Sequence, residues 1–182
     1  TGSSSLVKEV SGTGQLVKEG LGSLTLTGAN SYEGGTVVNS GTLAISKNAN
    51  LGKAGTNLAI NNATLALTDN VSVDRTISLA NSATIDTSAF NSSVTGVISG
   101  NANLIKHGGG TLSLEGVNSF KGEFNVAAGK VVVSNDKSLG DAANMVKLQT
   151  GTRLSTSSDV TVAQRVMATG DVTLDSMGNC RV

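Results

Sequence analysis

The sequence is poor in the bulky residues that fill most globular cores. Its 182 residues include no proline and no tryptophan, and only one tyrosine and three phenylalanines. A chain of this length can bury a sizeable core, so the scarcity of aromatic residues argues against an ordinary compact one. The apolar residues are mainly Val, Leu, Ile and Ala, in short runs between Gly, Asn, Ser and Thr. Because β-branched residues favour strands, we expect many short strands joined by tight corners.

Charge of one sign and long apolar runs are also missing. The formal net charge is +0 and only 14% of the residues are charged, which argues against a basic stripe for nucleic acid and a polybasic segment for a membrane surface. No apolar run approaches the roughly 18 residues of a membrane span. The first residues, Thr-Gly-Ser-Ser-Ser, do not resemble a signal peptide. We therefore expect neither nucleic-acid binding nor direct membrane insertion.

Cysteine and histidine each occur once. A single cysteine, Cys180, excludes an internal disulfide framework and a multi-cysteine metal site. This scarcity fits either a reducing cytosol or an exported chain that stays unfolded until it arrives. His107 has no second histidine and no nucleophile motif beside it. We expect His107 at an exposed corner and Cys180 at a polar one, and we predict no catalytic, cofactor or metal site.

The strongest signal that is present is an internal repeat. Residues 15–34 align with residues 103–122 at an offset of 88, which is 104 minus 16 when Leu16 is set on Leu104. Beyond them, Val71–Val73 aligns with Val160–Val162 at an offset of 89. The predicted structural repeat positions are Gly20, Gly22, Leu24, Leu26, Gly28, Asn30 and Gly34 in the first copy, and Gly108, Gly110, Leu112, Leu114, Gly116, Asn118 and Gly122 in the second.

Short alternating apolar runs between these glycines predict an all-β, right-handed parallel β-helix, or β-solenoid. With about 22 residues per coil, the repeat makes roughly four coils and the chain about eight, in a rod near 40 Å long. We expect the leucines to point inward, the glycines to turn the chain at positive φ, and Asn30 and Asn118 to occupy left-handed corners or to ladder between coils. A helix over 138–149 is the competing prediction, from helical spacing of its apolar residues.

The repeat resembles the autotransporter-associated β-strand repeat of bacterial type V secretion passengers. The first copy reads Gly12-Thr-Gly14-Gln-Leu16-Val-Lys18-Glu-Gly20-Leu-Gly22-Ser-Leu24-Thr-Leu26-Thr-Gly28-Ala-Asn30-Ser-Tyr32-Glu-Gly34-Gly35-Thr36. The second copy departs where Glu123-Phe124 replaces Gly35-Thr36. The resemblance implies export across the outer membrane through a C-terminal barrel, folding at the cell surface, and a role in adhesion, aggregation or toxin display.

The expected organisation is one solenoid segment over residues 1–182. It comprises two repeats, about 12–99 and 100–182, and the second is truncated at Val182. We therefore expect the natural protein to continue beyond this residue. The exposed end coils would be open β edges, covered by neighbouring coils in the full-length chain.

Some β-helices act on polysaccharides, and such sites need carboxylates aligned across adjacent coils. The candidates are Asp69, Asp74 with Arg75, Asp136 and Asp141. Asp136 takes the place of Asn48 in the other copy, which favours a corner role, and Asp74 and Arg75 are interpreted as a solvated ion pair whose side chains point apart. Tyr32 and Phe120 share a repeat position and are interpreted as corner fillers, not as an exposed sugar platform.

Three functions follow, in order of preference. The first is a non-enzymatic stalk segment of a secreted or surface-bound autotransporter passenger, which supports surface display, adhesion or aggregation and helps the passenger fold outside the cell. The second is an adhesin segment that itself binds a host ligand or another copy. The third is a polysaccharide-acting enzyme. The expected partners are neighbouring coils of the longer chain, with the host surface or a sister molecule as further candidates.

Overall fold

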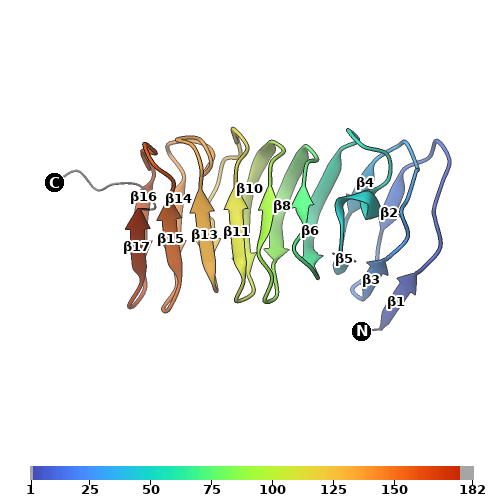
Figure 1. Cartoon of the computed structure of the whole chain (residues 1–182), viewed down its shortest axis with the longest axis horizontal. Coiled ribbons are helices and arrows are strands. Elements are labelled where there is room, and N and C mark those ends of the chain that lie inside the picture. Colours follow the sequence, from blue (N-terminus) through green and yellow to red (C-terminus); the bar gives the residue numbers. More distant parts are fainter. Residues whose placement is uncertain (1, 177–182) are drawn as a thin grey trace.

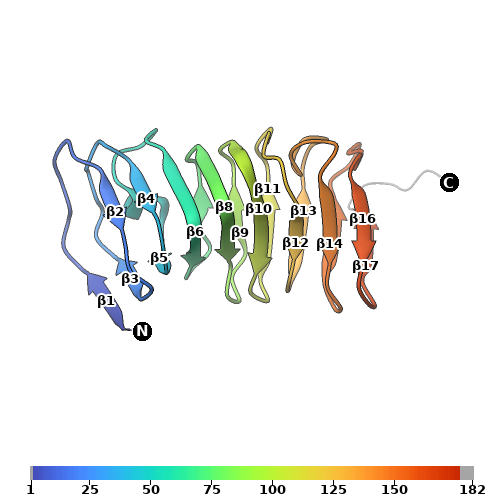
Figure 2. The same ribbon diagram turned by 180° about the vertical axis from the view of Figure 1, so that it is seen from behind.

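The computed structural model describes residues 2–176, which form a parallel β-solenoid of about nine turns (Figure 1). Strands β1 (Ser3–Leu6) and β17 (Thr173–Ser176) lie at opposite ends of the rod, and the view from behind shows the same stack of turns without a break (Figure 2). The predicted fold class is thus confirmed, with about nine turns where eight were expected.

Each turn of the solenoid passes over three faces of the rod, here numbered first, second and third. Not every turn forms a strand on all three faces. The second face is the most complete, with nine strands in order: β1 (Ser3–Leu6), β3 (Ser23–Leu26), β5 (Thr42–Ile45), β6 (Leu58–Leu67), β8 (Ile77–Asp86), β10 (Ile98–His107), β12 (Phe124–Val126), β14 (Met145–Leu148) and β16 (Arg165–Ala168). The third face holds β7 (Ser72–Val73), β9 (Ser92–Val94), β11 (Thr111–Leu114), β13 (Lys130–Val133), β15 (Arg153–Thr156) and β17 (Thr173–Ser176).

The first face begins with β2 (Leu16–Lys18) and β4 (Thr36–Val38), which pair in parallel. Three ten-residue strands, β6, β8 and β10, then cover two faces each: their first halves continue β4 and their second halves continue β5. The backbone turns between the halves at Asn62 and Asn81, with φ of 49° and 59°. One short 3₁₀ helix, η1 (Asn48–Leu51), takes the place of a third-face strand.

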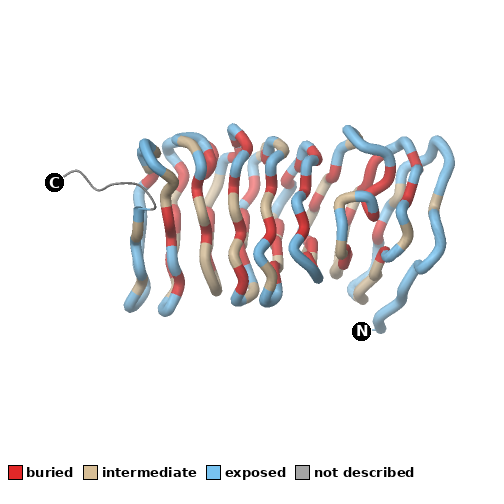
Figure 3. Tube along the Cα trace, in the orientation of Figure 1, coloured by how far each residue is buried: buried red, intermediate tan, exposed pale blue. Residues whose placement is uncertain are grey.

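The core is a continuous column of small aliphatic side chains. Alternate residues of a strand point to opposite sides, and the burial of β11 and β13 alternates accordingly, with Leu112, Leu114, Val131 and Val133 fully buried. Figure 3 shows this alternation along the stack. Because each turn buries its apolar side chains against the next, stability accumulates with every added neighbour. The helix alternative over 138–149 is wrong, since β14 lies within that range.

The two repeat copies are not in register with the turns. Parallel partners lead from Leu16 through Thr36, Leu58 and Ile77 to Ile98, so four turns take 98 minus 16, or 82 residues. The repeat equivalent of Leu16 is Leu104, six residues farther on.

Leu104 lies on the second face, paired with Ala83 and Phe124. Eighty-eight residues therefore make four turns and one face, which corrects the predicted four coils. Since a solenoid turn here has three faces, the second copy is rotated by about one third of a turn relative to the first. The predicted repeat boundaries, 12–99 and 100–182, stay a prediction.

Candidate functional site

A buried lysine stabilises the same corner in both copies. Lys18 and Lys106 are only 6% and 0% exposed. Lys18 Nζ donates to the carbonyl oxygens of Glu19, Gly20 and Ser40 at 2.8, 2.6 and 3.0 Å, and Lys106 Nζ donates to those of His107, Gly108 and Ala128 at 3.0, 2.6 and 3.0 Å. Burial lowers the pKa of Lys106 to about 8, an effect that the nearby Asp86 carboxylate partly opposes. This repeated lysine thus ties two successive turns together.

Asn30 and Asn118 clamp three successive turns in each copy. The backbone amide of Val10 donates to Asn30 Oδ1 at 2.8 Å, and Asn30 Nδ2 donates to Asn50 O at 2.6 Å. Asn118 makes the equivalent bonds to Ile98 N and Ser138 O, both at 2.7 Å. Neither asparagine has a positive φ, so the predicted left-handed corner is wrong and bonding between turns is what the structure shows.

The remaining repeat positions fall into two groups. Leu26, Leu112 and Leu114 are fully buried, whereas Leu24 is half-buried in the early turns. Six glycines allow close approach of the preceding turn, because a Cβ on any of them would lie 2.0–2.6 Å from a backbone atom there. They are Gly22, Gly28, Gly34, Gly110, Gly116 and Gly122. Of these, only Gly122 also has a positive φ, so their role is mainly steric. Gly20 and Gly108, at φ of 75° and 84°, make the expected left-handed corner.

The shared aromatic position is internal. Tyr32 is 2% exposed and its hydroxyl shares a 2.6 Å hydrogen bond with Thr36 Oγ1, while burial raises its pKa. Phe120 is fully buried and packs edge-on against Phe124, with ring centroids 6.3 Å apart. Neither ring therefore offers an exposed platform for a sugar.

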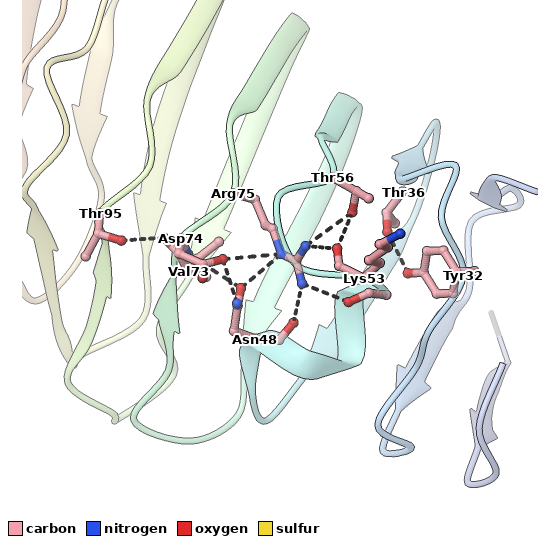
Figure 4. Close-up of polar contacts among 10 residues, drawn as sticks. Tyr32, Thr36, Asn48, Lys53, Thr56, Val73, Asp74, Arg75 and Thr95 are labelled. Carbon is pink, nitrogen blue, oxygen red and sulfur yellow. Dashed lines mark hydrogen bonds and ion pairs between the residues drawn. The ribbon is translucent and has the colours of Figure 1, made fainter. Parts of the chain in front are cut away.

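One groove of the described rod contains a buried arginine, Arg75 (Figure 4), and is called the first groove. This groove, of about 510 Å³, is lined by residues that include Asn30, Ser31, Glu33, Asn48, Lys53 and Arg75. The Arg75 side chain is 2% exposed, and its guanidinium donates to the carbonyl oxygens of Asn48 at 3.3 Å, Gly52 at 2.9 Å and Lys53. It also donates to Asn48 Oδ1 at 3.3 Å and Thr56 Oγ1 at 3.2 Å.

The prediction of a solvated Asp74–Arg75 pair is thus wrong. Asp74 Oδ1 does lie 3.4 Å from Arg75 Nε, with an exposed carboxylate, but the arginine faces inward to cap the loop around η1. A buried guanidinium needs many acceptors to offset its lost hydration, and this loop supplies five of them.

The second groove, of about 530 Å³, is built from the same repeat positions of the second copy, among them Asn118, Ser119, Lys121, Asp136, Asp141 and Gln164. Gln164 stands where the first groove has Arg75, at the offset of 89 that already relates 71–73 to 160–162. Its Nε2 donates to the carbonyl oxygens of Gly140 and Asp141 at 3.3 and 3.4 Å, which are the equivalents of Gly52 and Lys53. Sequence reasoning missed Gln164, although this alignment contains the signal.

An ion pair at the rim is reversed between the grooves. Glu33 pairs with Lys53 at 2.9 Å in the first groove. At the same positions in the second groove, Lys121 faces Asp141 at 4.0 Å. Because the second copy is rotated by one face, the two grooves open on different faces of the rod.

The carboxylates proposed for catalysis have structural partners. Asp136 Oδ1 accepts the Thr161 amide at 2.7 Å and Asp141 Oδ1 accepts the Ala143 amide at 2.9 Å, although both aspartates line the second groove. Asp69 Oδ1 accepts the neighbouring Asn70 amide at 2.7 Å and lines neither groove. These carboxylates therefore stabilise loops, which does not favour the enzyme hypothesis.

His107 lies at a corner, 61% exposed by its side chain, with Nδ1 3.4 Å from Asp86 Oδ2. Within residues 2–176 no three His, Cys, Asp or Glu side chains gather as metal ligands. Cys180 lies outside the described residues. The described part of the chain also contains no helix long and apolar enough to cross a membrane.

Comparison with known proteins agrees with this architecture. Residues 16–45 and 104–133 match the passenger-associated-transport-repeat. Over 143 residues the chain is 34% identical to the "Adhesin BmaC autotransporter" of Brucella suis biovar 1 (strain 1330); the match covers 78% of this chain and 4% of that protein. No solved structure matches the chain.

Proposed function

Because the chain is a segment of an autotransporter passenger with two passenger-associated transport repeats, we propose that it is a non-enzymatic stalk that holds an adhesive region away from the cell. The segment belongs to a surface-displayed or secreted protein. It spans about 4% of the length of the adhesin that it resembles, so the adhesive activity of the longer protein is part of this proposal.

The observation that supports a stalk is the uninterrupted ladder. Nine strands follow one another on the second face, and at about 4.8 Å per turn they span roughly 40 Å. The interior of the described turns is filled mainly by aliphatic side chains, which form one continuous cluster along the rod. Such a rod holds whatever is attached to one end at a fixed distance from the other end. Because each turn contacts only its neighbours, the rod also suits folding that proceeds turn by turn outside the cell.

The end turns suit further stacking. All four residues of β1 and of β16 are exposed, and exposed apolar side chains accompany them, notably Leu6, Leu21 and Val166. An unpaired strand edge with apolar side chains favours addition of another strand. We propose that neighbouring turns of the longer passenger cover both ends.

An adhesin segment that binds a partner directly is the second candidate, because the first and second grooves open on different faces of the rod. A polysaccharide-acting enzyme is not favoured, since Asp136 and Asp141 already serve as acceptors for loop amides.

Substitution in the full-length passenger separates stalk from adhesin. The segment would be replaced by nine turns of an unrelated parallel β-solenoid, and attachment of the bacteria to host cells would be measured at equal surface display. A stalk predicts that attachment is retained with the substitute and falls when the segment is simply deleted. Loss of attachment with the substitute would overturn the stalk proposal in favour of direct binding.

A further inference from the structure

The two grooves differ most at the position of Arg75 and Gln164. In the first groove the Arg75 guanidinium satisfies five acceptors at once, three of them carbonyl oxygens. In the second groove Gln164 reaches only two carbonyl oxygens, at 3.3 and 3.4 Å. Bonds of that length lie at the weak end of the range. The second groove thus keeps two acceptors of the guanidinium site, and a neutral amide bonds to them in place of the guanidinium.

One buried acceptor at the second groove lacks a donor. Gln164 is 6% exposed and its Oε1 has no hydrogen-bond partner among residues 2–176. The amide orientation is set by the two carbonyl oxygens that its Nε2 faces, since a flipped amide would direct an oxygen at them. A buried acceptor without a donor is costly, and because this oxygen is buried from solvent, a ligand's N–H group reaches it only when the Gln164 side chain moves.

A carboxylate also replaces an amide at one of the positions that contact the guanidinium in the first groove. Asn48 Oδ1 accepts from Arg75 Nε at 3.3 Å in the first groove, and Asp136 occupies the equivalent position in the second. One Asp136 oxygen accepts the Thr161 amide. The other has no hydrogen-bond or ion-pair partner within the described residues, so a negatively charged oxygen remains for a ligand.

We propose that the second groove binds the guanidinium of an arginine side chain supplied by a protein partner. The first groove is the internal precedent: the same carbonyl positions already hold a guanidinium there. A planar guanidinium with five donors fits several carbonyl oxygens and one carboxylate better than the compact ammonium of lysine does. This inference goes beyond the stalk function and is independent of it, because a stalk needs no occupied groove.

The test is a titration of the full 182-residue chain, labelled with ¹⁵N, by N-acetyl-arginine amide. Saturating chemical-shift changes are expected at Asp136, Asp141 and Gln164, with a dissociation constant on the order of 1 mM. The control ligand is N-acetyl-citrulline amide, which has nearly the same shape without the charge. It should bind at least about tenfold more weakly, since hydrogen bonds to charged groups are the stronger class. Equal shifts with both ligands, or no saturating shifts at the groove, would overturn the proposal.

Two exchanged variants supply matched controls. Gln164→Arg places a guanidinium on the chain itself, as Arg75 does, and should abolish the ligand-induced shifts. Arg75→Gln should create a second binding site, seen as new shifts around Asn48 and Lys53. Should Gln164→Arg fail to fold, Asp136→Asn at the groove surface is expected to weaken binding several-fold. Undiminished binding by the folded Gln164→Arg protein, or by Asp136→Asn, would refute the assignment to this groove.

Discussion

The two repeat copies, represented by residues 16–45 and 104–133, keep their contacts with the backbone and change their contacts between side chains. Lys18 and Lys106 each donate to three equivalent carbonyl oxygens. By contrast, the Tyr32–Thr36 hydrogen bond in one copy becomes the Phe120–Phe124 ring contact in the other. The stacked backbone fixes which carbonyl groups need donors, whereas two neighbouring side chains can change together without disturbing the turn.

The copies also differ in position around the axis. Because the repeat is four turns and one face long, its equivalent surfaces do not line up along one side of the rod. A partner that approaches from one direction meets the groove of only one copy. In a passenger built this way, equivalent positions of successive repeats lie on different faces of the rod, so the grooves of two copies do not have to bind the same partner.

The largest difference between the copies is expected in the core. Leu24 and Leu112 are equivalent in sequence, but Leu112 is fully buried and Leu24 is only half-buried. Leu112→Ala should lower the free energy of unfolding by about 3 kcal/mol through lost burial and a residual cavity. Leu24→Ala should cost only about 1 kcal/mol, because less apolar surface is removed from contact.

Urea unfolding followed by circular dichroism measures both values, and Leu112→Asp should be still more disruptive because it buries an unpaired charge. Equal costs for the two alanine variants would show that burial in the stack does not distinguish the copies.

A smaller effect is expected from the charge on Lys106, which appears as a pH dependence. The folded pKa is about 8 and the ordinary value is 10.5, because burial disfavours the charged form. The unfolded chain therefore holds this proton to higher pH than the folded one. Below pH 8 the buried charge of Lys106 lowers the free energy of unfolding by its full amount. The free energy of unfolding should rise by about 2 kcal/mol as the pH goes from 8 to 10.5.

Lys106→Met should remove this rise, while Lys121→Met, at an exposed lysine, should retain it. The free energy of unfolding at pH 7.5 and pH 10 provides the comparison. A rise of the same size in Lys106→Met would assign the effect to another group.

Much of the fold follows from the spacing of leucine and glycine, and the parts that do not follow have physical causes. Turns of 20, 22, 19 and 21 residues separate Leu16, Thr36, Leu58, Ile77 and Ile98. A sequence offset counts residues and not faces, so the rotation between the copies is hidden in these unequal turns.

Arg75 was misread for a related reason. Its neighbour Asp74 suggests a local pair, but the acceptors that bury the guanidinium come from the turn about 20 residues earlier. The lysine and asparagine positions can be recognised in the sequence because they occur in both copies. Their hydrogen bonds to the turns before and after depend on how the turns stack, which the sequence pattern does not give.

The aromatic position offers a test of about 1 kcal/mol. Tyr32→Phe leaves Thr36 Oγ1 buried without its 2.6 Å partner and should cost about 1 kcal/mol. Combined with Thr36→Val, which removes the other hydroxyl, the double variant should recover part of that loss, with a coupling of about 1 kcal/mol. Phe120→Tyr introduces a hydroxyl beside Phe124 and should cost between about 1 and 2 kcal/mol. Additive effects of the Tyr32 and Thr36 substitutions would mean that their hydroxyls do not depend on each other.

The reversed ion pair at the rim should matter least for stability. Glu33 and Lys53 are 48% and 60% exposed by their side chains, and exposed pairs contribute little because water screens them. The double variant Glu33→Lys/Lys53→Asp gives the first groove the polarity of the second and should change the free energy of unfolding by less than about 0.5 kcal/mol. Thermal unfolding at low and high salt measures it, with the single variant Glu33→Lys as the control that leaves two like charges together. A loss of several kcal/mol in the double variant would show that the direction of the rim ion pair depends on the buried Arg75. The rim of each groove could then not have changed without its loop.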